Sequence, residues 1–370
     1  MTTVLTDELI LCAAPPGDRD IDAAGFASIW LAADVYARGQ RLLGRSARVL
    51  VAAGDAPRPR SSRDGSLRDG IEEGGRAAAT LRRAGIGIDG VLTFQGEGPG
   101  VLPLRRQQGR QLGDKPMPVR LTVFAGRDAL TARSLIEAVA EIPDLGPITD
   151  TRIVAPPALT DLSGRSFDPS TGRAIFLNDL LDRVPAEALR FYLALMSEPH
   201  DARELSLADL ARTHNLFLVR DLGTSLGAIA NLDPVAGTAL PHDRAEDDLI
   251  TDFRARLHAA LDGRSFSLAA LAGVVLGLNG QMKQARLYGT PERIPRLAGL
   301  FQLFARPVMP ATADAVAGFL GLGTGWGEAW TRVGGEIPSC SARFVRGAAP
   351  GFDTVDEADL VALESGSAAA

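Results

Sequence analysis

The sequence predicts an α/β domain with a parallel sheet, followed by an α-helical bundle. Before residue 200, short apolar runs alternate with helical stretches, a pattern typical of βαβ units. After residue 200 the strand signals fade and long helical patterns take over. We therefore expect an α/β domain over residues 1–200, a helical bundle over residues 201–345 and a C-terminal tail over residues 346–370.

The strand candidates of the first half are apolar runs bounded by turn-forming residues. They cover residues 9–14, 47–53, 91–94, 119–124 and 153–155. The helices expected between them cover residues 22–43, 70–83 and 130–142. The first of these helices is followed by Gly44, a residue type that commonly ends helices. We interpret the polar stretch 58–66 as a loop and the glycine-rich stretch 95–100 as a flexible turn.

The second half reads as a bundle of helices. Helical patterns cover residues 205–232, 247–261, 268–288, 291–304 and 310–320. Pro291 and Pro310 each stand at a predicted helix start, where a missing backbone N–H does least harm. Residues 357–370 are acidic and then rich in serine and alanine, and we expect them to be frayed.

Composition favours a large folded core without a membrane partner. The chain has 370 residues, of which 46% are hydrophobic. No window approaches the ~18 uninterrupted apolar residues of a membrane span, and the N-terminus lacks the layout of a secretory signal. Cys12 and Cys340 are the only cysteines, too few for a disulfide framework. These features together predict a soluble cytoplasmic protein.

Six short stretches stand in an informative order and at plausible spacing: residues 11–15, 31–44, 124–128, 185–194, 216–232 and 305–313. Together they resemble methionyl-tRNA synthetases, a class I family. Residues 11–15 resemble the first strand, residues 31–44 the helix after the HIGH motif and residues 124–128 the F-x-G-K-D stretch. Residues 185–194 resemble the segment after the KMSKS loop, and residues 216–232 and 305–313 resemble the anticodon-binding bundle. The resemblance implies a Rossmann-like nucleotide-binding domain followed by a bundle of anticodon-binding type. It also implies that Ala13 and Ala14, at the end of the first strand, line the amino-acid pocket.

The two catalytic signatures of that family are degenerate here. The stretch aligned with HIGH reads Ala23-Ala-Gly-Phe26, or Asp22-Ala-Ala-Gly25 if the gap moves by one residue. Only Gly25 persists, and no side chain is left to donate hydrogen bonds to triphosphate at this helix N-terminus. The stretch aligned with KMSKS reads Ser166-Phe-Asp-Pro-Ser170, in which both lysines are missing. Losing several such donors makes ordinary adenylate formation implausible.

Three arginines near these positions offer a way to rebuild a phosphate site. Arg19, Arg165 and Arg173 flank the degenerate motifs, and guanidinium groups bind phosphate bidentately. The competing interpretation is that they are solvated loop residues of a chain whose 39 basic residues include only two lysines. ATP is therefore the one cofactor left open, and none is assigned.

The substrate and metal sites of the family are altered as well. Asp55 follows the second strand and could hold a substrate ammonium group, or it could be a plain turn residue before Pro57. The interval between Phe94 and Val119 is short and contains no cysteine, so a zinc knuckle of the all-cysteine kind cannot form there. The histidines also lack the spacing of a metal-binding helix, and we predict no metal site. Cys12 lies in a buried strand candidate and is expected to be a core residue.

The bundle is a doubtful platform for tRNA because its half of the chain is net negative. A local basic face is conceivable around the turn at residues 289–290, from Lys283, Arg286, Arg293 and Arg296; the alternative is an ordinary solvated surface.

Three functions stay open at this stage. The first is a repurposed synthetase paralogue that handles an amino acid or a derivative in specialised metabolism, without ordinary aminoacylation. The second is an ATP-dependent amino-acid-activating ligase with the arginine-rebuilt site. The third is a non-catalytic regulatory protein with a protein partner. The sequence favours the first.

Overall fold

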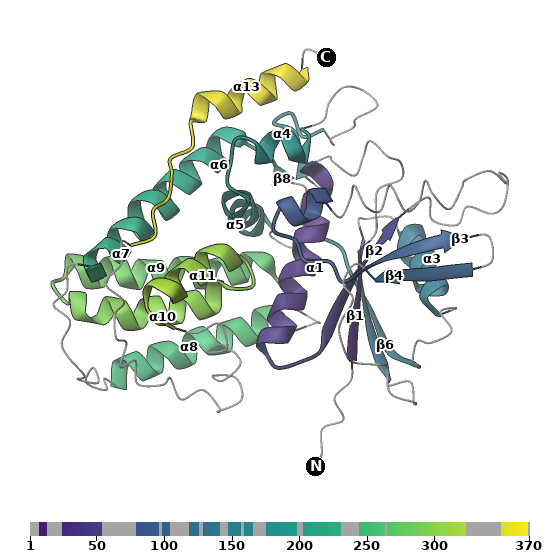
Figure 1. Ribbon diagram of the computed structural model, residues 1–370, viewed down its shortest axis with the longest axis horizontal. Coiled ribbons are helices and arrows are strands. Elements are labelled where there is room, and N and C mark those ends of the chain that lie inside the picture. The colour runs from purple at the N-terminus through teal and green to yellow at the C-terminus, as the bar shows by residue number, and fades with distance from the viewer. Residues whose placement is uncertain are drawn as a thin grey trace.

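The computed structural model describes most of the chain. The described residues are 7–12, 24–53, 79–95, 98–103, 118–125, 129–140, 147–156, 159–165, 175–197, 203–230, 244–262, 265–322 and 349–368. A twisted sheet lies at one side of the molecule and most of the helices lie at the other (Figure 1). None of the described helices is long and apolar enough to cross a membrane.

The main sheet has six strands in the order β4-β3-β2-β1-β5-β6. The strands are β1 (Asp7–Cys12), β2 (Ala47–Ala53), β3 (Gly90–Gln95), β4 (Gly98–Pro103), β5 (Val119–Phe124) and β6 (Ile148–Val154). All neighbours pair in parallel except β3 and β4. The predicted Rossmann-like sheet is therefore confirmed. Strands β1, β2, β3 and β5 fall close to the predicted ranges, whereas β6 begins five residues before the predicted range 153–155.

Strand β4 corrects the prediction of a flexible turn over residues 95–100. Residues 98–103 form a strand that pairs antiparallel with β3, and Gln95 lies opposite Gly98. Glycine and proline are poor strand formers, which hid this strand from the sequence pattern. They are tolerated here because β4 is an edge strand that needs partners on one side only.

Helices cover both faces of the sheet, and β1 is buried on both. Leu9 and Leu11 belong to a small core that includes residues of α3 (Ala129–Ala140), whereas Ile10 and Cys12 belong to a larger core that includes α1 (Ala24–Leu42). Successive strand residues point to opposite faces, so an uninterrupted apolar run is what a doubly covered strand needs. Residues 79–83 are also helical, whereas the rest of the helix predicted over residues 70–83 lies outside the described residues.

The second half is helical, as predicted. Its described helices are α6 (Leu207–His214), the π-helix η2 (Asn215–Leu222), α7 (Gly223–Ala230), α8 (Arg244–Leu261), α9 (Leu268–Leu287), the 3-10 turn η3 (Pro291–Arg293), α10 (Ile294–Ala305), α11 (Pro310–Phe319) and α13 (Glu357–Ala368). Side chains of Ser206 and Ser267 cap α6 and α9 by accepting hydrogen bonds from backbone N–H groups at 3.2 and 3.1 Å. Pro291 and Pro310 start their helices as expected.

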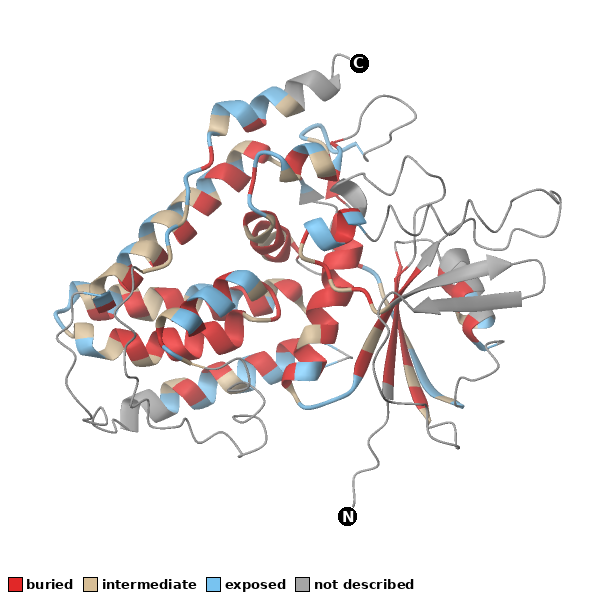
Figure 2. Cartoon of the chain, viewed as in Figure 1, coloured by how far each residue is buried: buried red, intermediate tan, exposed pale blue. Residues whose placement is uncertain are grey.

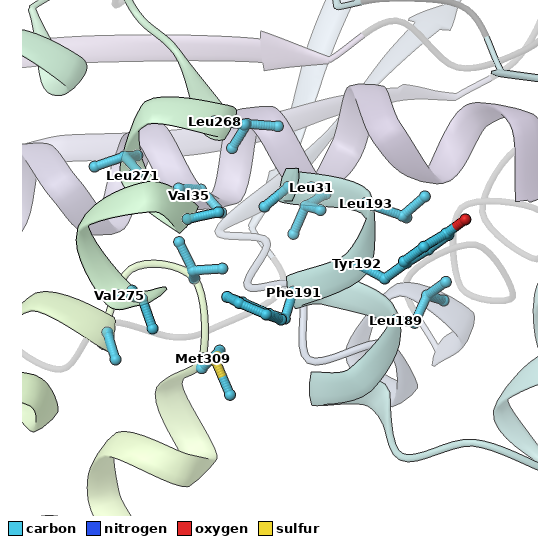
Figure 3. Packing of buried hydrophobic residues seen from close by; sticks show 14 of the residues in the cluster. Leu31, Val35, Leu189, Phe191, Tyr192, Leu193, Leu268, Leu271, Val275 and Met309 are labelled. Atoms are coloured by element: carbon cyan, nitrogen blue, oxygen red, sulfur yellow. The ribbon is translucent and has the colours of Figure 1, made fainter. Parts of the chain in front are cut away.

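One hydrophobic core joins the helices to the sheet. Helices α4 (Leu177–Leu181) and α5 (Ala186–Met196), which precede residue 200, pack with the helices that follow it. Residues of α1, α5 and α9 meet around Phe191, Val275 and Met309 (Figure 3). Buried residues accordingly line the faces that these helices turn toward one another (Figure 2). The boundary at residue 200 stays a prediction, but the described residues on its two sides share one interior.

A buried ion pair crosses this interior. Nη2 of Arg190, on α5, donates to Oδ2 of Asp34, on α1, at 2.7 Å. The two side chains are only 2% and 1% exposed. Arg190 also donates through Nε to the Val308 carbonyl at 2.8 Å and through Nη1 to the Gly85 carbonyl at 3.0 Å. The guanidinium thus holds α1, α5 and the segments around residues 85 and 308 together.

The expectation of a frayed C-terminus is wrong for the described part of the tail. Residues 357–368 form α13, which packs against α6, and Val355 and Leu360 are buried. The acidic stretch lies where acidic residues favour helix formation, with Glu357 and Asp359 in the first turn of α13. Residues 369–370 lie outside the described residues.

Replacing Arg190 by methionine should lower the free energy of unfolding by about 3–5 kcal/mol, because the buried Asp34 carboxylate would lose its buried partner and keep only the partly exposed Arg38. Urea denaturation of the wild type and the variant measures this loss. The double variant Asp34→Leu/Arg190→Met should recover part of it, since neither buried charge is left and Arg38 is partly exposed to water.

The exposed pair Arg133–Glu137 on α3 provides the matched control. Arg133→Met should leave the stability nearly unchanged, because an exposed pair is screened by solvent. An Arg190→Met variant as stable as Arg133→Met would contradict the importance given to the buried pair.

Candidate functional site

The sheet topology marks the edge where a ligand would bind. From β1 the chain continues to β2 on one side, whereas β5 leads to β6 on the other. In such sheets ligands bind outside the carboxyl ends of the strands, at the point where the order reverses. This point lies between β1 and β5, whose last paired residues are Cys12 and Phe124.

The predicted amino-acid pocket borders this edge in sequence. Ala13 and Ala14 directly follow β1, and Asp55 follows β2 by two residues. All three lie outside the described residues, so their role in substrate binding stays a prediction. The described floor of the edge is apolar, since Cys12, Phe124 and Ala125 are at most 1% exposed.

The N-terminus of α1 stands where the HIGH motif would be. Gly25 is the second residue of α1, so the predicted nucleotide-binding glycine lies in the first helical turn. That turn reads Ala24-Gly-Phe-Ala27, which supplies backbone N–H groups and no side-chain donor. Arg19 and Arg173, two of the three arginines proposed to replace the lost donors, lie outside the described residues.

The third arginine, Arg165, is bound by a carboxylate. It lies after the short strand β7 (Leu159–Thr160), which pairs with β8 (Arg203–Glu204), and directly before the stretch aligned with KMSKS. Its Nε donates to Oδ2 of Asp161 at 3.2 Å and to Oγ of Ser163 at 3.0 Å. Its backbone N–H donates to Oδ1 of Asp161 at 2.9 Å. The arginine is therefore engaged within its own turn.

Asp161 organises this turn as an acceptor. Besides the Arg165 amide, its Oδ1 accepts from the backbone N–H of Ser163 at 2.9 Å and from the Ser163 hydroxyl at 2.7 Å. These hydrogen bonds favour the ionised carboxyl group and lower the pKa of Asp161 to about 2, with the Arg165 amide as the largest cause. The donors of this turn that could bind a phosphate already donate to the Asp161 carboxylate.

Cys12 is a core residue, as predicted. Its side chain is 1% exposed, and its Sγ lies 3.8 Å from the Ile29 carbonyl. Burial, and secondarily the charge of Asp34, raises the pKa of the thiol far above its usual range. The thiol therefore stays protonated and cannot act as a nucleophile at neutral pH.

The residues proposed for a basic face are all half-buried. Lys283 donates to Oδ2 of Asp221 at 3.1 Å, so its charge is partly offset. The basic face proposed at the turn after α9, and tRNA binding with it, stays a prediction. Among the described residues, no three His, Cys, Asp or Glu side chains gather as they would around a metal ion.

Sequence reasoning overlooked the two carboxylates that matter most for this region. Asp34 and Asp161 were not singled out, although each leaves a signal. Asp34 interrupts an otherwise apolar helix face, and Arg190 does the same in Ala188-Leu-Arg-Phe-Tyr192, which is how a buried pair appears in a sequence. Asp161-Leu-Ser-Gly164 has the composition of a side-chain-capped turn.

Comparison with known proteins supports the resemblance. The family model described as tRNA synthetases class I (M) matches residues 117–228, which run from β5 into α7. Methionine–tRNA ligase of Bifidobacterium adolescentis is 27% identical over 121 residues, which cover 30% of this chain and 20% of that protein. The enzyme of Bifidobacterium longum subsp. infantis is 27% identical over 150 residues, which cover 37% and 24%. The chain thus matches about a quarter or less of these relatives' length.

Solved structures extend the likeness to the whole fold. Mycobacterium tuberculosis methionyl-tRNA synthetase in complex with methionyl-adenylate superposes with a TM-score of 0.58 at 12% identity, covering 95% of this chain and 99% of that chain. Its apo form gives a TM-score of 0.56 at 13% identity, covering 95% and 100%. At such low identity the likeness establishes the fold and nothing about activity.

Over residues 117–228 the chain is similar to class I tRNA synthetases, and its fold is that of the solved synthetases. The chain is therefore methionyl-tRNA synthetase-like, since the relatives and the structures named above are methionyl enzymes.

Carbon-detected NMR titration should show Asp161 ionising at a pKa of about 2. The depressed pKa means that the turn is stabilised by the ionised carboxylate above about pH 4 and loses that contribution as the pH falls toward 2. Ser163→Ala removes one donor and should raise the pKa toward its usual range. An Asp161 that titrates normally in the wild type would show that the turn is not closed as described.

Proposed function

We propose that this chain is a repurposed methionyl-tRNA synthetase-like protein that handles an amino acid or an amino-acid derivative without ordinary tRNA aminoacylation. The scaffold supports this proposal because the strand edge that binds small ligands in such sheets is retained. The stretches aligned with HIGH and KMSKS support it as well, because the side chains that would drive adenylate formation are replaced there.

The Asp161–Arg165 turn is the observation that carries the proposal. Triphosphate would have to displace Asp161 from Arg165 and from two backbone N–H groups before it could bind there. Exchanging one anion for another gains little, and an undisplaced carboxylate repels the phosphates. The turn therefore opposes ATP at the site where the family resemblance places the KMSKS loop.

The first turn of α1 supports the same conclusion independently. A helix N-terminus attracts phosphate through its backbone N–H groups, but catalysis needs further donors aimed at the developing charge. The sequence Ala24-Gly-Phe-Ala27 offers none. Each missing donor typically costs ~10²–10³ in rate, so two degenerate motifs together remove the adenylation chemistry.

Two alternative functions remain, an ATP-dependent ligase and a regulatory protein. Arg165 is 60% exposed at its side chain, so its guanidinium could reorient, and with Arg19 and Arg173 it could serve an ATP-dependent ligase. A non-catalytic regulatory protein, with a protein partner in place of a substrate, would need neither nucleotide nor amino acid. Nucleotide binding separates the ligase from the other two functions, and an amino-acid ligand separates the repurposed paralogue from the regulatory protein.

ATP–pyrophosphate exchange assayed with each standard amino acid should stay at the background rate, because the donors that stabilise adenylate formation are absent. An active methionyl-tRNA synthetase in the same assay provides the positive control. Exchange with any amino acid would refute the proposal, and its loss in Arg165→Ala would then support the arginine-rebuilt ligase.

Calorimetric screening of amino acids and their derivatives should find a ligand that depends on Asp55. Replacing Asp55 by asparagine removes the charge that would hold the ammonium group and should weaken binding about 10- to 100-fold. Asp248→Asn, at an exposed position on α8, is the matched control and should bind normally. If no amino acid or derivative binds the wild type, the regulatory function is favoured instead.

A further inference from the structure

The C-terminal residues 349–368, which we call the C-terminal clasp, lie along α6 and the π-helix η2. Figure 1 shows this yellow segment running beside both helices before it ends in α13. Val355 and Leu360 are the buried anchors of the clasp, with exposures of 6% and 0%. Arg212 on α6 also pairs with Glu357 at 2.5 Å. The clasp is thus held by apolar and ionic contacts at several points.

Asn215 recognises the backbone of the clasp through both atoms of its amide. Its Nδ2 donates to the Val355 carbonyl at 2.8 Å, and its Oδ1 accepts from the Val355 N–H at 2.9 Å. This two-point contact fixes the register of an extended segment without depending on its side chains. It lies at the start of η2, one residue after His214.

His214 makes the next contact, and its protonation state follows from its partner. Nε2 lies 2.8 Å from the Asp353 carbonyl, which can only accept, so Nε2 carries the proton. In the neutral ring, Nδ1 then carries no proton. Nδ1 is buried and has no hydrogen-bond partner among the described residues, and the side chain is 3% exposed overall.

Protonation of Nδ1 is therefore unfavourable while the clasp is docked. It would add an N–H donor and a positive charge at Nδ1, in a buried position without an acceptor. Burial lowers the pKa of His214 for this reason, although the bond to the Asp353 carbonyl opposes the shift. Once the clasp leaves, water can solvate the imidazolium and the ring regains its ordinary affinity for protons.

Among the described side chains, the charged groups on the surrounding elements do not offer a partner to that proton. On α5, α6 and η2 each is paired or engaged elsewhere, and on the clasp each is exposed or holds another group. They are Glu187 and Arg190 on α5, Asp209 and Arg212 on α6, Arg220 and Asp221 on η2, and Asp353, Asp356, Glu357 and Asp359 on the clasp.

We propose that residues 349–368 form an acid-released clasp, docked on α6 and η2 while His214 is neutral and released when both of its ring nitrogens carry protons. This device goes beyond the proposed function and does not depend on it. Because the docked state binds fewer protons, docking is strongest above about pH 6.5. Below that value the docking equilibrium falls by up to about tenfold per pH unit, until the lowered pKa of the docked state is reached.

Hydrogen exchange read by mass spectrometry tests the clasp in the full-length chain. After correction for intrinsic rates, protection of the amides in residues 352–360 should fall by up to about fivefold between pH 6.5 and pH 5.5. His214→Gln keeps an amide N–H that can reach the Asp353 carbonyl but cannot take up a proton. Protection in this variant should not change over the same range.

Two controls separate His214 from other groups that titrate. His258→Gln, on an exposed part of α8, should keep the wild-type response. Asn215→Ala should lower protection at both pH values and keep the dependence on pH. A wild type without the fall, or the same fall in His214→Gln, would overturn the proposal. If His214→Gln does not fold, NMR titration of the wild type decides, since a His214 pKa at or above 6.5 would overturn it equally.

Discussion

The ion pair between Asp34 and Arg190 is the interaction on which the rest of the structure depends. It lies in the shared interior, where α1 from the sheet layer meets α5 and the turn before α11. Charges this deeply buried are costly unless every group is paired, and here Arg38 and the Gly87 N–H complete the shell of Asp34 at 2.8 and 2.9 Å. Few other arrangements of the helices would satisfy all these groups, so the pair specifies how bundle and sheet fit together.

Under the function that we propose, this constraint explains how a synthetase-like scaffold can persist while its chemistry changes. The pair fixes the helix whose N-terminus would carry the HIGH motif and the helix that follows the KMSKS-like stretch. The described partners of Asp34 and Arg190, besides each other, are Arg38, Gly85, Gly87, Pro307 and Val308, and none of them belongs to the Asp161–Arg165 turn. Substitutions in the loops can therefore remove phosphate donors, or place Asp161 against Arg165, without disturbing the frame.

The separation of interacting residues along the chain decides how much of the fold and of the site the sequence can predict. Strands such as 47–53 and 119–124 were predicted at their observed bounds because an apolar run records local burial on both faces of a sheet. Strand β4 was missed because glycine and proline are poor strand formers and the strand is held by pairing with β3. Helix α13 was missed because its acidic and then Ser/Ala-rich composition is typical of a frayed tail, whereas the helix packs on α6 through residues such as Leu360. At the site, the missing motif donors were evident from residue types alone. The engagement of Arg165 by Asp161 was not, because a turn's hydrogen bonds depend on geometry that composition does not encode.

The central claim is that the nucleotide end of the site no longer binds ATP, and calorimetry tests it directly. The full-length chain is titrated with ATP and magnesium, with and without methionine. We predict no heat of binding at millimolar nucleotide under either condition. Saturable binding at micromolar concentration that is lost in Arg165→Ala would contradict the account and would show that arginines have taken over the phosphate site.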